Sequence, residues 1–200
     1  MIAVVDYGAS NLRSVLRALR AAGVEADATA DPDAVRRAER VVVPGVGHFA
    51  PAAQRLAETG LGAAVSEVAH AGRPVLGICL GLQLFLAGSE EAPDARGLGL
   101  LRGRAIRFRT DLPVPHVGWS RVELTDAGRA HPALAPAFFY HVHSYHPDAV
   151  SAEDALAQAE YGAPFATVVG RDNVLGVQFH PEKSQAAGLA LLGAFARWAP

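Results

Sequence analysis

The only cysteine of this 200-residue chain lies between two glycines, in the sequence GICLG at residues 77–81. A nucleophile between glycines on a sharp turn from a strand into a helix is accessible to a substrate, because small neighbours let the backbone fold tightly. A helix beginning near Leu80 would favour a thiolate at Cys79, and the Leu80 N–H could hold an oxyanion. A lone cysteine is more often packed in a core. Gly77 and Gly81 add nothing to a core, so the pattern indicates a nucleophile.

A histidine and a glutamate two residues apart could supply the base that a cysteine nucleophile needs. His180 and Glu182 fall in GVQFHPEKSQ, residues 176–185, at the end of an apolar stretch. Side chains at i and i+2 of a strand point the same way, so Glu182 can orient the His180 ring. Pro181 between them ends the strand and stiffens the spacing. The alternative is a histidine at a strand end beside an unrelated surface glutamate. The cysteine motif favours the catalytic interpretation over this one.

A second glycine motif, PGVGHF, follows an apolar run and occupies residues 44–49. Gly45 and Gly47 let the backbone turn its N–H groups toward an anion or reverse a peptide, so this loop could complete an oxyanion hole beside Leu80. A phosphate-binding loop is disfavoured, because no lysine follows at the required position. Taken alone, the motif is equally consistent with a plain turn.

Further histidines occur in HVHSYH, residues 141–146, at a spacing that a metal could use. His141 and His143 share one face of a predicted strand, and His146 follows. Neither a carboxylate nor a thiolate is adjacent in the sequence, so we favour a half-buried polar strand and expect no metal. His116, in PHVGW at 115–119, is consistent with a packed loop. We expect three histidines at the surface: His48, His70 and His131.

These residues must be positioned by the elements around them. Short apolar runs at 2–5, 41–43 and 74–78 are each followed by glycine or proline and then by helical spacing, a pattern typical of buried parallel strands alternating with helices. Residues 11–23 predict a helix with leucine and valine on one face and arginine on another. Beyond residue 98 we expect antiparallel strands at 138–142, 155–161 and 165–180, the last with a hairpin at RDN, and a final helix over 184–198. The expected fold class is α/β, with a mixed, mainly parallel sheet flanked by helices.

Composition narrows the classes of function. Half of the residues are hydrophobic and the formal charge is −2, so charge gives no argument for nucleic acid or an anionic membrane. The N-terminal stretch is a poor secretory signal and no apolar run is long enough for a membrane span, so we expect a cytoplasmic protein. Candidate loops at 93–97, 110–118 and 126–136 are too short for linkers between domains. We therefore expect a single domain over residues 1–200.

Together, PGVGHF, GICLGLQLF, PHVGW, HVHSY and GVQFHPEKSQ, in this order, resemble the class I (triad) glutamine amidotransferases. With DYGASNLRSV at 6–15, the set is similar specifically to glutaminase subunits of imidazole glycerol phosphate synthase. The resemblance covers residues 6 to about 185. It implies a flavodoxin-like fold, hydrolysis of L-glutamine, and a heterodimer with a cyclase subunit that uses the ammonia in histidine biosynthesis.

The resemblance also implies a role for each matching residue. Cys79 would be the nucleophile, His180 the general acid and base, and Glu182 the orienting carboxylate. Leu80 and the loop residues Gly45, Val46 and Gly47 would form the oxyanion hole. The remaining matches are the glutamine-binding positions Gln83, Glu91, His143, Ser144 and Tyr145, and the partner-facing positions Asn11, Trp119 and Lys183. The implied acyl transfer requires no cofactor, because sulfur and imidazole carry every step.

Two departures from the family pattern are present. Ser10 stands where the family has glycine, in the partner-facing region, and His141 replaces the aromatic residue that commonly follows Tyr140. Two alternatives stay open: a glutaminase subunit of another synthase, such as the one that feeds pyridoxal phosphate synthesis, and a non-catalytic binding module of the same fold. The first should lack PHVGW and the DYG motif, and the second should have an unreactive thiol.

Overall fold

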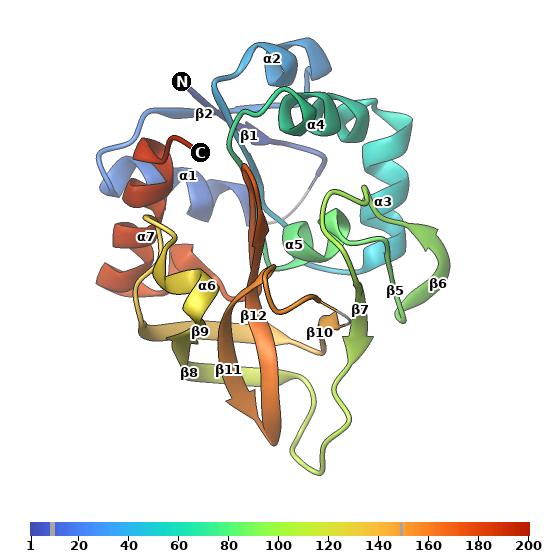
Figure 1. Cartoon of the computed structure of the whole chain (residues 1–200). Coiled ribbons are helices and arrows are strands. Elements are labelled where there is room, and N and C mark those ends of the chain that lie inside the picture. Colours follow the sequence, from blue (N-terminus) through green and yellow to red (C-terminus); the bar gives the residue numbers. More distant parts are fainter. Residues whose placement is uncertain (9–10, 149) are drawn as a thin grey trace.

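The computed structural model describes residues 1–8, 11–148 and 150–200, and a mixed β-sheet runs through its centre (Figure 1). The strand order within these residues is β2-β1-β3-β4-β13-β12-β11-β8-β9. The first five strands in this order are parallel to one another: β2 (Ala26–Thr29), β1 (Ile2–Val5), β3 (Arg40–Val43), β4 (Val75–Ile78) and β13 (Val174–Val177). The other four are antiparallel: β12 (Ala163–Arg171), β11 (Ala155–Tyr161), β8 (His116–Leu124) and β9 (Ala137–His143). This confirms the predicted α/β sheet with antiparallel additions.

Helices cover both faces of the parallel half. One face carries α1 (Leu12–Ala21) and α7 (Gln185–Arg197), and the other carries α2 (Pro32–Arg37), α3 (Phe49–Glu58), α4 (Leu61–His70) and α5 (Leu80–Phe85). Two short helices, α6 (Asp126–Arg129) and η1 (Pro181–Lys183), complete the set. A second sheet of order β10-β7-β5-β6 lies beside α3 and α5, with β10 at Tyr145–Asp148, β7 at Arg104–Arg107, β5 at Gly88–Ser89 and β6 at Ala92–Arg96.

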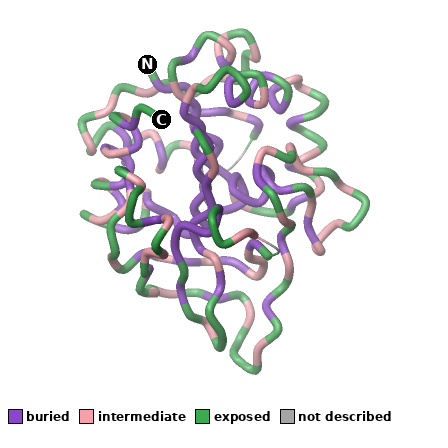
Figure 2. The backbone as a smooth tube through the Cα atoms, viewed as in Figure 1, coloured by how far each residue is buried: buried purple, intermediate pink, exposed green. Residues whose placement is uncertain are grey.

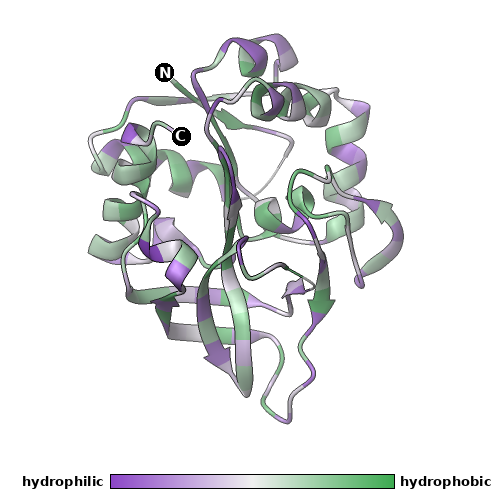
Figure 3. Cartoon of the chain, in the orientation of Figure 1, coloured by the Kyte–Doolittle hydropathy of each residue, from purple (hydrophilic) through white to green (hydrophobic). Residues whose placement is uncertain are grey.

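The strand pattern explains the two-sided core. Along β1, Ala3 and Val5 pack into the cluster beneath α3 and α4, whereas Ile2 and Val4 pack beneath α1 and α7. Because successive side chains of a strand point to opposite faces, a strand covered on both sides must be apolar at every position. The buried centre and exposed rim follow this arrangement (Figure 2), and apolar residues concentrate along the central strands (Figure 3).

The structure corrects three of the expected loops and adds strands that were not predicted, namely β2, β5, β6, β7, β8 and β10. Residues 93–97 fall largely in β6, residues 116–118 belong to β8, and residues 126–129 form α6. Strand β2 was not predicted, because its sequence, ADAT, is half-exposed at the edge of the sheet and lacks an apolar run. No helix within the described ranges is long and apolar enough to cross a membrane.

Candidate active site

Cys79 lies at the turn between β4 and α5, where the chain adopts an unusual backbone conformation. Its φ of 54° and ψ of −106° cost about 1–3 kcal/mol, which the surrounding structure must offset. The flanking glycines permit the turn: a Cβ on Gly81 would lie 2.0 Å from the Val43 carbonyl oxygen, and one on Gly77 would lie 2.7 Å from the backbone of Gly81. The strand-to-helix turn expected around Cys79 is therefore present.

His180 follows β13 and lies between Cys79 and Glu182. Its Nδ1 is 2.7 Å from Glu182 Oε1, and both side chains are fully buried. Because a carboxylate oxygen only accepts, Nδ1 carries the proton in this bond. The Nδ2 of Asn11, at the start of α1, donates to the same Glu182 oxygen over 3.1 Å. His180 Nε2 is buried and has no hydrogen-bond partner among the described residues, so it is available for proton exchange with Cys79.

Opposing effects set the charges of this pair. Burial lowers the pKa of His180, but the electrostatic and hydrogen-bonding contributions of Cys79 and Glu182 outweigh burial and raise this pKa to about 10. Burial raises the pKa of Glu182, but its contacts with His180 and Asn11 outweigh that effect and hold the pKa below the usual value. At neutral pH the pair is therefore an imidazolium and a carboxylate.

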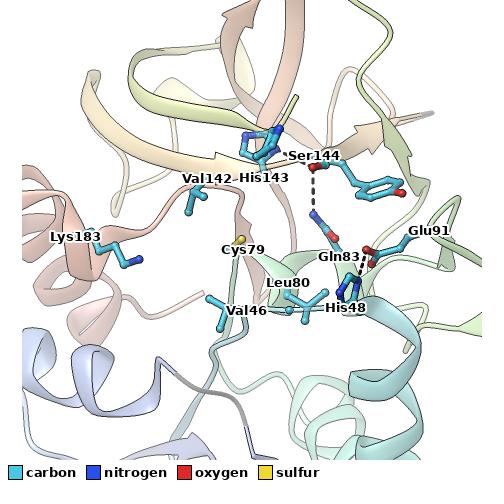
Figure 4. Close-up of a pocket in the computed structure, with 13 residues that line it drawn as sticks. Val46, His48, Cys79, Leu80, Gln83, Glu91, Val142, His143, Ser144 and Lys183 are labelled. Atoms are coloured by element: carbon cyan, nitrogen blue, oxygen red, sulfur yellow. Dashed lines mark hydrogen bonds and ion pairs between the residues drawn. The ribbon is translucent and has the colours of Figure 1, made fainter. Parts of the chain in front are cut away.

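A cavity of about 480 Å³ opens in front of Cys79 (Figure 4). It is lined by loop 46–48, the start of α5, Glu91, Pro115, residues 142–145 and Lys183. The structure thus brings Gln83, Glu91, His143, Ser144 and Tyr145 around the cysteine, as expected for a common pocket. The polar side chains at its wall can hold the amide, ammonium and carboxylate groups of a small amino acid.

Gln178 is a fully buried residue beside Cys79 and Gln83 that the sequence analysis missed. Its Nε2 lies 3.7 Å from the Cys79 sulfur, and its Oε1 accepts from Gln83 Nε2 over 3.2 Å. Gln83 Nε2 also lies 3.2 Å from the Tyr145 carbonyl oxygen. Gln178 lies two residues before His180, but a neutral amide carries no catalytic signature of its own, so this spacing alone did not identify it.

Glu91 anchors the PGVGHF loop to the pocket wall. One carboxylate oxygen lies 3.0 Å from His48 Nδ1, and the other accepts from the Phe49 N–H over 2.7 Å at the start of α3. His48 is exposed, as expected, yet it also borders the cavity. His70 is exposed as well, whereas His131 is only partly exposed and packs on Trp198.

The oxyanion donors are not assembled in this conformation. Leu80, Val46 and Gly47 line the cavity, but the Leu80 N–H points at the Gly45 carbonyl oxygen, 3.4 Å away. A carbonyl in this place repels an oxyanion. Reversal of the Gly45–Val46 peptide would release Leu80 and turn a second N–H toward the same space.

An exposed apolar patch adjoins the cavity on the outer pair of strands. Val117 and Trp119 of β8 and Phe138 of β9 are 57%, 45% and 56% exposed, respectively. Trp119 stacks edge-on against Tyr140 with ring centroids 6.0 Å apart, and Lys183 Nζ lies 5.8 Å above the Tyr140 ring. Of the three partner-facing predictions, Trp119 and Lys183 fall in this patch. Asn11 is buried against Glu182, and Ser10 lies outside the described residues.

The histidines of HVHSYH pack in a cluster with aromatic rings. His116 is buried at the start of β8, stacked on Tyr161 and His141, and is not a loop residue. In the described part of the chain, no group of three or more His, Cys, Asp or Glu side chains is arranged to hold a metal ion.

Comparison with known proteins places these features in a family. Residues 3–195 match the family model "Glutamine amidotransferase class-I". The chain is 49% identical over 200 residues to imidazole glycerol phosphate synthase subunit HisH of Symbiobacterium thermophilum, covering 98% of this chain and 93% of the relative. It is 40% identical over 205 residues to the HisH subunit of Bacillus subtilis, covering 100% and 97%.

Solved structures agree at the level of the fold. A crystal structure of a glutamine amidotransferase superimposes with a TM-score of 0.79 at 19% identity, covering 98% of this chain and 99% of that one. PurLQS from Thermotoga maritima gives a TM-score of 0.75 at 17% identity, covering 98% and 97%. The chain belongs to the class I glutamine amidotransferases and, within them, to the HisH family of imidazole glycerol phosphate synthase subunits.

Proposed function

We propose that this chain is the glutaminase subunit of an imidazole glycerol phosphate synthase and that Cys79, His180 and Glu182 are its catalytic triad. The observation that carries the proposal is the conjunction of a cysteine on a strained turn with a buried His180–Glu182 pair at the wall of a polar cavity. A core cysteine requires none of these features.

The reaction consists of two acyl transfers. The Cys79 sulfur attacks the side-chain carbonyl carbon of glutamine, the carbon–nitrogen bond breaks, and the His180 imidazolium gives its Nε2 proton to the departing ammonia. Water then attacks the thioester, His180 accepts its proton, and glutamate leaves. The raised pKa of His180 suits the first step, because the proton is already in place.

Acylation of Cys79 prepares His180 for the second step. The sulfur of a thioester is uncharged, so the contribution of Cys79 to the raised pKa of His180 disappears once the thioester has formed. Burial then lowers the pKa, and the same imidazole becomes a base for water. Glu182 holds the ring in one tautomer throughout, with Nε2 facing the reaction.

Glutamine would lie along the cavity. Gln83, Glu91 and residues 143–145 supply acceptors and donors for its amino-acid end, and Gln178 is within reach of the sulfur that it approaches. The oxyanion hole requires reversal of the Gly45–Val46 peptide, so the present conformation corresponds to a resting enzyme.

We infer that the patch around Trp119 receives the cyclase subunit, with Lys183 beside the Tyr140 ring at its edge. The patch adjoins the cavity through Val142 and Lys183. Ammonia released at Cys79 would therefore pass directly to the surface that the cyclase subunit covers. Passage without exposure to water keeps ammonia unprotonated and reactive. We expect the protein to work in the cytoplasm, where the enzymes of amino-acid synthesis act.

A labelling experiment tests the nucleophile. A glutamine analogue carrying a chloromethyl ketone should add once to the peptide containing Cys79, and excess glutamine should prevent the reaction. Iodoacetamide is the control, because it does not resemble glutamine and labels any accessible, reactive thiol. Equal labelling by both reagents, unaffected by glutamine, would leave an accessible thiol but no glutamine site.

A further inference from the structure

A chain of hydrogen bonds runs through two buried histidines between the patch strand and the pocket. Ser120 Oγ lies 2.9 Å from His116 Nε2, and His116 Nδ1 lies 3.3 Å from His143 Nε2. His143 Nδ1 lies 2.8 Å from the Tyr145 carbonyl oxygen. The first member is on β8 beside Trp119, and the last two line the cavity in front of Cys79.

Only one proton arrangement fits this chain when both rings are neutral. A carbonyl oxygen accepts and never donates, so His143 Nδ1 carries the proton and its Nε2 is an acceptor. His116 must then donate from Nδ1 and accept at Nε2 from the Ser120 hydroxyl. Burial lowers the pKa of both histidines, which keeps them neutral at physiological pH.

Packing holds the His116 ring in this orientation. One face stacks on Tyr161 with ring centroids 4.1 Å apart, and His141 stacks at 5.0 Å, both with planes 21° apart. His141 makes separate bonds, to the Phe139 carbonyl oxygen and to Thr167 Oγ1. His141 therefore packs in the same cluster as His116 but takes no part in the hydrogen bonds that link His116 to Ser120 and His143.

We propose that His116 is a positioning residue for the glutamine pocket. It fixes the tautomer and orientation of His143, and His143 in turn fixes the Tyr145 carbonyl, which also accepts from Gln83. His116 does not line the cavity. Its loss should therefore weaken glutamine binding without changing the chemical step. This inference rests on the proposed function, because it assigns a role within that pocket.

The kinetic test uses the chain assembled with its cyclase subunit and the cyclase's nucleotide ligand. His116→Phe keeps an aromatic ring but removes the donor to His143, and we expect KM for glutamine to rise about tenfold with kcat within about twofold. His141→Phe, the matched control, should leave KM unchanged. His116→Asn offers a donor again and should recover most of the loss. A wild-type KM in His116→Phe, or an equal rise in both phenylalanine variants, would overturn the proposal.

A spectroscopic test requires no activity. The ring-nitrogen shifts of the ¹⁵N-labelled, unsubstituted chain at neutral pH should show His116 and His143 protonated at Nδ1, and the signals of His116 are identified by their absence in His116→Phe. Protonation of either ring at Nε2 would break the chain of donors and refute the arrangement. If the unsubstituted complex releases no glutamate, the proposed function fails, and the spectrum still decides the histidine arrangement.

Discussion

Replacement of Glu182 by glutamine tests the charge balance at His180. The substitution keeps shape but removes the carboxylate that lies 2.7 Å from His180 Nδ1 within a fully buried pair. A hydrogen bond to a charged group contributes about 1.5–3 kcal/mol, and about 1.4 kcal/mol corresponds to one pKa unit. The pKa of His180 should therefore fall from about 10 by about one to two units.

The assay is glutamate release by the complex between pH 6 and pH 10.5. In the unsubstituted protein the imidazolium persists until the pH approaches about 10, so the alkaline loss of activity should appear only near that pH. In Glu182→Gln this loss should begin about one to two pH units lower, and kcat at neutral pH should fall about ten- to a hundredfold, because a neutral amide holds the imidazolium more weakly than a carboxylate does.

Asp154→Asn is the matched control. The Asp154 side chain is also buried and charged, but its partner is Arg171, 3.3 Å away, outside the candidate site. This variant should keep the alkaline limit of the unsubstituted protein. An unchanged alkaline limit in Glu182→Gln, or an equal shift in the control, would refute the assignment of Glu182 as the group that sustains the imidazolium.

Three further outcomes follow from particular contacts. Gly81→Ala places a Cβ 2.0 Å from the Val43 carbonyl oxygen and should lower the melting temperature sharply, whereas Gly88→Ala, with 3.4 Å to its nearest atom, should be tolerated in the same thermal scan. Burial lowers the pKa of His141 to about 3, so the unfolded chain binds this proton first and the free energy of unfolding falls as the pH drops below about 6.5. In urea unfolding, His141→Phe should lose about 2 kcal/mol less than the unsubstituted protein between pH 7 and pH 5. Identical losses in the two proteins would contradict this. Trp119→Ala should weaken cyclase binding about thirtyfold in calorimetry, and an unchanged Kd would remove the patch from the interface.

The parts of the fold that were predictable are those whose residues are buried on both sides. Strands β1, β3 and β4 stand out as apolar runs because every position is covered by a helix. Strands β2 and β6 lie at the edges of their sheets, and their sequences, ADAT and APDAR, carry no apolar run. Edge strands depend on backbone hydrogen bonds to one neighbour, which residue types alone do not reveal.

The residues of the candidate site also differ in how far they could be predicted from the sequence. Cys79, His180 and Glu182 have chemically distinctive side chains, so the sequence predicted that they would meet. The reason given for the His180–Glu182 pair was wrong, because β13 ends at Val177 and Glu182 lies in η1 and not on a strand. Gln178 was missed, because a neutral amide just beyond the end of β13 has no such signature. The orientation of the Gly45 carbonyl was also inaccessible, since reversal of one peptide leaves every residue type unchanged.

The most direct test of the central claim is glutamate release from glutamine by the purified chain, measured alone and with the cyclase subunit and its nucleotide ligand, with Cys79→Ala as the blank. We predict a low rate alone, because the Gly45 carbonyl faces the oxyanion donor, a strong rise in the liganded complex, and no activity in the variant. A rate unaffected by the partner would contradict the assignment to this synthase, and glutamate release by Cys79→Ala would contradict the proposed chemistry.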